Sequence, residues 1–314
     1  MAQTPRAEAS IEVIGDTFAF NSPVTGRFRA ELGEAALSHA IRYCRYFGYD
    51  SLSSASKRAY ATDHPANHRG MLIPYGLRNF AKMMSDPATA GYLNQTTDLP
   101  ILQSLGYTAP NRWGPPVPGQ DSLSHTWYAQ SVAVESIGAC GVCVAEQVRT
   151  VGYSWWQRNH VLPGVCVCSV HGLVLQRFEI QEVLKEQGKL PHDVVTDARQ
   201  DATSFSYAKV YTHAVQAVAS SAPKLSPSAV LEKTFDHLPE RLGGDLLSDL
   251  QLSELLQYSL PAAEATAMLA SAPSVVRRHA LLNGTRRTSW VPMLLLAVLA
   301  FGSFQQVVRA GTYD

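Results

Sequence analysis

The sequence predicts a mainly α-helical protein that carries a small zinc ribbon, which makes the fold class α+β. Apolar residues recur at helical spacing over much of the chain, and two short stretches alternate like strands. Beside these stretches lie metal-binding residues in the order Cys-x2-Cys-x24-Cys-x2-His. With 314 residues, 46% of them hydrophobic, the chain is long enough for two domains, or for one domain with a zinc insert.

Residues 1–105 form the first predicted part, which is helical. Apolar residues from Leu32 to Phe47 recur three and four positions apart, and Gly48 follows them. This pattern predicts an amphipathic helix that stops at the glycine. A second helix is expected to begin at Pro74 and to end before Pro87, because proline suits a first helical turn and cannot continue a helix.

A linker and the zinc ribbon come next. Residues 106–124 are rich in proline and glycine, which favour neither helix nor strand, so we place a boundary there. Residues 125–180 hold the ribbon. The alternation at 127–137 predicts a strand that leads into the first cysteine pair, and residues 165–168 predict a strand that leads into the second Cys-x2-His pair.

Residues 181–314 are predicted to be helical, and a helix-turn-helix is one arrangement that they allow. Ser226 before Pro227 is typical of a capped helix start, and residues 249–258 carry four leucines. Residues 290–301 are almost wholly apolar. Because a membrane span needs about 20 apolar residues, we expect a buried core helix here and no membrane anchor.

The predicted ligands of one zinc ion are Cys140, Cys143, Cys168 and His171. Two thiolates three residues apart are expected to face one ion only if the backbone reverses tightly, and Gly141 permits such a reversal. Three thiolates and one imidazole suit Zn²⁺ and leave no coordination position open, so the expected metal is structural.

Cys166 competes with Cys168, because side chains two residues apart on a strand share a face. Only Cys168 has the x2-His spacing, so we interpret Cys166 as a small buried hydrophobe. Four of the five cysteines lie between residues 140 and 168, which argues against a disulfide framework and for a reducing compartment. No signal-peptide pattern opens the chain, so the expected location is the cytoplasm.

Five further residues are predicted to support the zinc module: Trp155, Trp156, His160, Pro163 and Gly164. His160 would serve as a ligand or a base on one interpretation. The alternative that we favour is a hydrogen bond from its imidazole to the loop 162–164. The two tryptophans would stack on bases or, more often for such aromatics, cover a small zinc module that has little core of its own.

The charge pattern gives one candidate for nucleic-acid or partner contact. The chain has 26 basic and 26 acidic residues, so no global charge favours nucleic acid. Residues 277–313 contain five arginines and no acidic residue, and the alternative to DNA or RNA contact is a solvated helix face. These arginines are Arg277, Arg278, Arg286, Arg287 and Arg309.

Motifs of common enzymes are missing from the sequence. It contains no Gly-x-Ser-x-Gly, no phosphate-binding Gly-x4-Gly-Lys-Ser/Thr, no His-Glu-x2-His and no zinc-deaminase pattern. Together with a metal whose four positions are filled, this leads us to expect no enzymatic activity.

The stretches around the predicted ligands follow a characteristic order. A Trp-Trp pair precedes His160, the run Leu-Pro-Gly-Val comes next, and a His-Gly pair follows Cys168. Over residues 140–175 this order resembles the TniQ/TnsD family of transposon target-selection proteins, with weaker similarity at 72–77, 93–100 and 292–304. Val142 and Ser169 stand where the family has proline. No cysteine follows Cys168, so the second zinc cluster of larger members has no ligands here.

The resemblance implies a non-catalytic adaptor that helps to choose where a bacterial transposon inserts. Its implied partners are the AAA+ regulator of the transposase and either a CRISPR effector complex with guide RNA or the target-site DNA, and a homodimer is also compatible with the sequence. The alternative is a self-sufficient, sequence-specific, zinc-containing DNA-binding protein with a helix-turn-helix near its C-terminus. A third alternative is an enzyme without a known motif. Balanced charge favours the adaptor.

Overall fold

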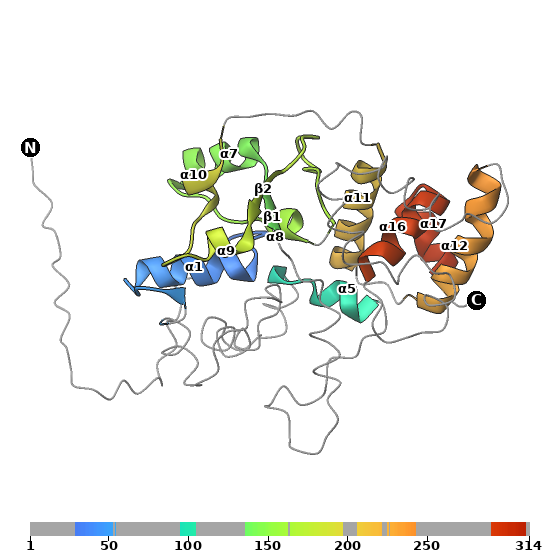
Figure 1. Ribbon diagram of the computed structural model, residues 1–314, viewed down its shortest axis with the longest axis horizontal. Helices are drawn as coiled ribbons and strands as arrows, with labels where there is room; N and C mark the ends of the chain where they lie inside the picture. The colour runs from blue at the N-terminus through green and yellow to red at the C-terminus, as the bar shows by residue number, and fades with distance from the viewer. Residues whose placement is uncertain are drawn as a thin grey trace, which may run out of the picture.

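The computed structural model describes residues 29–52, 54, 95–104, 136–162, 164–196, 206–221, 225, 227–242 and 290–311. Within these ranges the protein is mostly helical and has one small sheet of two antiparallel strands (Figure 1). The strands are β1 (Ser136–Ala139) and β2 (Gln176–Glu179). The helices are α1 (Ala36–Tyr46), α5 (Leu99–Ser104), α7 (Gly141–Val151), α8 (Arg158–Val161), α9 (Ile180–Val183), α10 (Pro191–Val194), α11 (Ser206–Ser221), α12 (Pro227–Leu242), α16 (Trp290–Phe301) and α17 (Phe304–Gly311).

Helix α1 confirms the first predicted helix but begins four residues later than the apolar pattern suggested. Leu32 is 97% exposed and lies in a turn with Gly33, whose φ is +72°, so Leu32 does not belong to the buried face. Ile41 and Cys44 are fully buried on that face. The helix ends before Gly48, which has a φ of +68° and donates its N–H to the carbonyl of Arg45, as a glycine stop requires.

The predicted ribbon is only partly present. Strand β1 takes the end of the predicted stretch 127–137, of which 127–135 lie outside the described residues. It pairs with β2 so that Ser136 faces Glu179 and Ala139 faces Gln176. Residues 165–168 do not form the second strand. The chain makes a single β-bridge there, between Val167 and Val174, and then turns.

Two apolar cores organise the described residues. The first joins α1 to the sheet, to α9 and to Trp156, whose indole donates to the carbonyl of Lys189 at 2.8 Å. The second joins α11, α12, α16 and α17 to the loop that carries Cys168. In Figure 1 the helices of the second core gather at one end of the molecule, and the sheet with α1, α7 and α10 lies at the other.

Arg158 links these two cores. Its backbone N–H donates to the carbonyl of Gly33 at 2.7 Å, next to α1. Its buried guanidinium donates to the carbonyls of Thr97 at 2.8 Å and Ala219 at 3.3 Å, which lie before α5 and near the end of α11. Arg158 therefore bonds the segment before α1 through its backbone and the segments at α5 and α11 through its side chain.

Helix α16 confirms the predicted buried helix at residues 290–301. Every residue from Leu294 to Ala300 is buried, and the helix packs against α11, α12 and α17. No helix in the described ranges has the length and apolar character that crossing a membrane requires. Helix α12 begins at the predicted Pro227. The expected helices at 74–86 and 249–258 and the linker at 106–124 lie outside the described residues.

Candidate metal centre

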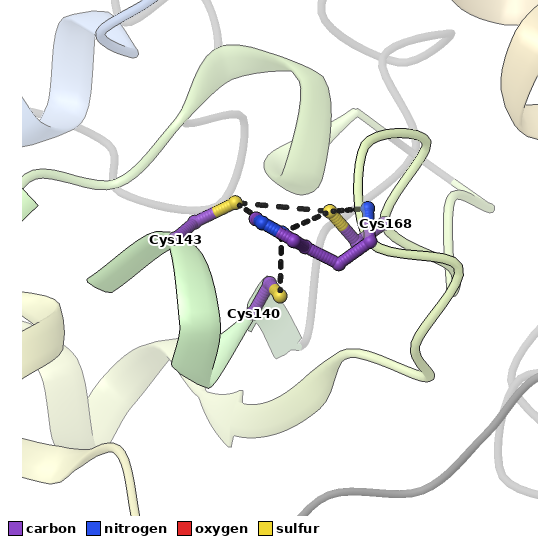
Figure 2. A group of neighbouring side chains, drawn as sticks. Cys140, Cys143 and Cys168 are labelled. Atoms are coloured by element: carbon purple, nitrogen blue, oxygen red, sulfur yellow. Dashed lines mark hydrogen bonds between the residues drawn. The ribbon is translucent and has the colours of Figure 1, made fainter. Parts of the chain in front are cut away.

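The four predicted ligands meet at one point of the structure. Cys140 directly follows β1, and Cys143 lies in the first turn of α7. Cys168 and His171 come from the loop between Val167 and Val174. Figure 2 shows the three cysteine side chains directed toward one another from these two segments. The sequence therefore identified a set of residues that the fold brings together from positions 25 to 31 residues apart.

The distances between the ligand atoms fit a tetrahedral site. His171 Nδ1 lies 3.2 Å from the sulfur of Cys143 and 3.6 Å from the sulfurs of Cys140 and Cys168. The sulfurs of Cys143 and Cys168 are 3.7 Å apart, and all four ligand atoms lie within 4.8 Å of one another. Since Zn–S bonds of about 2.3 Å give a tetrahedron with edges of about 3.7 Å, one zinc ion fits between them.

The first cysteine pair is presented by a helix start, which corrects the predicted role of Gly141. Gly141 is the first residue of α7 and does not have a positive φ, so no tight reversal occurs there. Cys140 and Cys143 instead share a face because three residues make nearly one helical turn. A β-carbon at Gly141 would lie 3.3 Å from the carbonyl oxygen of Thr196, so close packing accounts for the glycine.

The reversal occurs in the second pair, at Gly172. This residue has a φ of +65° and donates its N–H to the carbonyl of Cys168 at 2.8 Å. The N–H of Cys168 donates to Leu173 at 2.8 Å, and the N–H of His171 lies 3.4 Å from the sulfur of Cys168. The His-Gly pair in the sequence signals this turn, because glycine adopts a positive φ at little cost.

Electrostatics favour a cation among these side chains. Hydrogen bonds from the other two thiols lower the pKa of Cys140, while hydrogen bonds with Cys140 raise the pKa of both Cys143 and Cys168. The three buried sulfurs therefore favour one thiolate among themselves, because like charges repel at this distance. A divalent cation would allow all three to ionise, and the N-terminus of α7 adds a positive partial charge on the same side.

Glu146 is a neighbour of the site that the sequence did not reveal. Its carboxylate oxygen lies 3.6 Å from His171 Nε2, while Nδ1 of the same ring faces the sulfurs. The arrangement assigns Nδ1 as the ligand atom. The available signal was the position of Glu146, three residues after Cys143 on one helix face.

The five residues predicted to support the zinc module lie in different surroundings, and that role stays a prediction. Trp156 is fully buried in the first core, and the backbone N–H of Trp155 donates to the side chain of Gln147 at 3.1 Å. His160 is buried in α8 and is not one of the four clustered ligands. Gly164 has a φ of +77°, as a turn requires, and Pro163 lies outside the described residues. The predicted hydrogen bond from the His160 ring to this loop stays a prediction.

Cys166 and the arginines complete the predicted set. Cys166 is buried and packs in the second core, apart from the four-ligand cluster. Of the five arginines, Arg309 is exposed in the last turn of α17, and the other four lie outside the described residues.

Ser154, His192 and Asp193 form a second polar group, which resembles a catalytic triad in composition only. The hydroxyl of Ser154 lies 2.8 Å from His192 Nδ1, and His192 Nε2 lies 3.6 Å from Asp193. Ser154 is fully buried, however, and its oxygen accepts the backbone N–H of His192 at 2.9 Å. The serine therefore holds the first turn of α10 in place and is not exposed to a substrate.

Comparison with known proteins adds no identity to this geometry. No family model matches the sequence, and no curated protein matches it.

Proposed function

We propose that this protein is a non-catalytic, TniQ-like target-selection adaptor whose Cys3His cluster binds one structural zinc ion. The observation that carries the proposal is the convergence of Cys140, Cys143, Cys168 and His171 within 4.8 Å. The ligand set comes from the same stretch that resembles the TniQ/TnsD family. A metal whose four positions are all filled by protein supports a role in architecture and binding.

The zinc ion would act as a cross-link. When bound, it would join the start of α7 to the loop 167–174, two segments that the β1–β2 sheet and the second core also hold together. Cys140 and Cys168 are each at most 1% exposed, so the ion would be shielded from substrates. Small modules of this kind depend on metal because their own apolar core is limited.

The proposed adaptor role determines which binding partners we expect. In this proposal the protein binds the AAA+ regulator of a transposase and a target-recognition module, and it breaks no bond itself. Balanced charge over the whole chain supports partner contact rather than general affinity for nucleic acid.

Metal analysis of the purified chain tests the zinc site. We expect about one zinc per chain, and we expect Cys140→Ser and His171→Ala to lose both metal and stability, since structural zinc contributes about 10–16 kcal/mol in small zinc peptides. Cys166→Ala is the matched control, because Cys166 is equally buried but lies outside the cluster. It should keep the metal that Cys168→Ala loses. Folded protein without zinc would refute the site.

Co-purification tests the adaptor role. The full chain is expressed with the AAA+ ATPase and the transposase encoded in the same genome, and stable co-elution with the ATPase is expected. Cys168→Ala should weaken co-elution, whereas Cys166→Ala should not. Absence of any complex with the zinc-loaded chain would reject the adaptor and leave the metal site standing.

A further inference from the structure

The four ligands of the candidate metal centre differ in how far solvent reaches them. Cys140, Cys143 and Cys168 are at most 5% exposed and belong to the second core. The side chain of His171 is 18% exposed, and its neighbour Val170 is 74% exposed. Of the four ligands, the imidazole is therefore the one that solvent reaches most readily.

The backbone of the ligand loop allows the His171 ring to move without Cys168. The N–H of Cys168 donates to the carbonyl of Leu173, and its carbonyl accepts the N–H of Gly172, both at 2.8 Å. These two bonds hold the loop closed on either side of His171 and do not involve its ring. Rotation about the side-chain bonds of His171 therefore frees Nδ1 while Cys168 stays in place.

Helix α7 is the fixed side of the site, and it contacts both nitrogens of the His171 ring. Val144 anchors the helix in the first core, and Cys143 anchors it in the second. The sulfur of Cys143 lies 3.2 Å from Nδ1, and a carboxylate oxygen of Glu146 lies 3.6 Å from Nε2. Because three residues make nearly one helical turn, a single helix face presents a ligand and a carboxylate to one ring.

A carboxylate in this position strengthens the bond between an imidazole and a metal. With the metal on Nδ1, the ring keeps a proton on Nε2. The negative charge of Glu146 attracts this N–H, orients the ring and makes Nδ1 a better electron donor, and such partners typically change metal affinity by about 10- to 100-fold. The Glu146 side chain is 56% exposed, so water competes for its carboxylate and the contact is readily broken.

We infer that His171 is the gate through which zinc enters and leaves the site, and that Glu146 holds this gate closed. The inference rests on the proposed zinc site and adds the ligand at which exchange begins. Glu146 acts through His171, so it is a positioning residue. Exchange through this gate requires no opening of either core, because the three buried sulfurs stay where the second core holds them.

Zinc release from the full zinc-loaded chain to a chromophoric chelator tests the role of Glu146. Glu146→Ala should release zinc roughly 10- to 100-fold faster than wild type. Glu146→Gln should lie between the two, because its amide oxygen is still an acceptor for the Nε2 proton but carries no charge. Glu179→Ala removes an exposed carboxylate of β2 and is the matched control, which should release zinc at the wild-type rate.

Alkylation with iodoacetamide during the same release tests which ligand opens first. If His171 opens first, Cys140, Cys143 and Cys168 react only as zinc leaves, so their alkylation follows zinc release in wild type and in Glu146→Ala. Mass spectrometry of the peptides identifies the modified cysteines. Alkylation of any of the three before zinc release would show that a thiolate opens first, and it would overturn the gate.

The outcomes separate this inference from the proposed zinc site. Equal release rates for wild type and Glu146→Ala, each carrying one zinc per chain, would overturn the inference and leave the zinc site standing. Equally fast release from Glu179→Ala would also overturn it, since the effect would then belong to charge in general. Wild type that binds no zinc would refute the site and the gate together. The melting temperature of each zinc-loaded variant shows that the fold is intact, since the replaced side chains are exposed.

Discussion

His160 shows how burial alone changes the chemistry of one residue. His160 is 3% exposed and belongs to α8, a helix that packs against β1. Burial lowers its pKa to about 4, and the nearby His171 and Arg177 act in the same direction against the attraction of Cys140. The imidazole is therefore neutral at physiological pH, as expected of a histidine that packs in an interior.

This shift predicts a pH dependence of stability. The unfolded chain binds a proton at His160 near pH 6.5, and the folded chain binds it only near pH 4. The free energy of unfolding is therefore not reduced by His160 above pH 6.5. It falls by about 3 kcal/mol as the pH falls toward 4, because the unfolded chain gains the proton first. We expect His160→Gln to lose this decrease when the free energy of unfolding is measured by urea unfolding at pH values from 7.5 to about 4.

Protons also compete with zinc for the thiolates in this range, so the comparison needs a control. His213→Gln changes an exposed histidine of α11 and should keep the slope of wild type. Identical slopes for wild type and His160→Gln would show that the ring is not buried as the structure has it.

Ligand identity was predictable at the residue scale, but contacts between distant residues were not. A metal requires a fixed number of soft ligands, and their paired spacing is visible in one dimension. The contact between Ser154 and His192 depends on where two segments 38 residues apart are packed, and no local pattern records it. Glu146 lay close to Cys143 in sequence, yet only the position of the loop makes it a neighbour of His171.

At the scale of elements, Gly188 fixes how α1 meets the chain after α9. It has a φ of +85°, and a β-carbon there would lie 2.7 Å from Cγ1 of Ile41, inside van der Waals contact. Its carbonyl accepts a hydrogen bond of 3.0 Å from Arg45 at the end of α1. Both conformation and close packing therefore require glycine at this turn.

Gly188→Ala should destabilise the protein by two separable costs. The positive φ costs about 1 kcal/mol, and overpacking against Ile41 adds about 1–3 kcal/mol. Gly152→Ala supplies the control, since Gly152 has a φ of +83° with no atom within 4 Å of the added carbon. Urea unfolding should give a clearly larger loss for Gly188→Ala. Equal losses would mean that Ile41 moves aside freely.

The elements that the sequence predicted well are those with local causes. Helix α1 was visible from its apolar period and its glycine stop, and α12 from its proline at the start. The prediction of a second ribbon strand at 165–168 was wrong, because the backbone hydrogen bonds of Cys168 with Leu173 and Gly172 close a loop around the metal ligands. The strand lies further on, at β2, where the sequence has no strong alternation.

At the scale of the whole molecule, the metal site belongs to the second core and lies next to a residue of the first. The ligands Cys140, Cys143 and Cys168 belong to the second core, whereas Ala139, which precedes them, belongs to the first. Helix α16 is buried by α11, α12 and α17 and contains no ligand. Loss of the metal should therefore act locally before it acts globally.

Hydrogen exchange with and without a zinc chelator tests this expectation. Amides at 140–143 and 167–175 should lose protection when zinc is removed, while those of α16 should stay protected. The Cys166→Ala protein should respond as wild type does, since it keeps the ligands. Simultaneous loss of protection in α16 would indicate that the whole chain unfolds as one unit with its metal.

The contacts of α1 also determine how long its apolar face stays uncovered while the chain is synthesised. Arg45 pairs with Asp193, which follows it by 148 residues, and Trp156 and Leu190 of the same core come almost as late. At about 5–20 residues per second, the ribosome delivers these partners roughly 5–30 seconds after the helix itself. During that interval the apolar face of α1 lacks the partners that cover it in the finished fold. Until those residues emerge, that face is apolar surface of the kind that makes a nascent chain prone to aggregate.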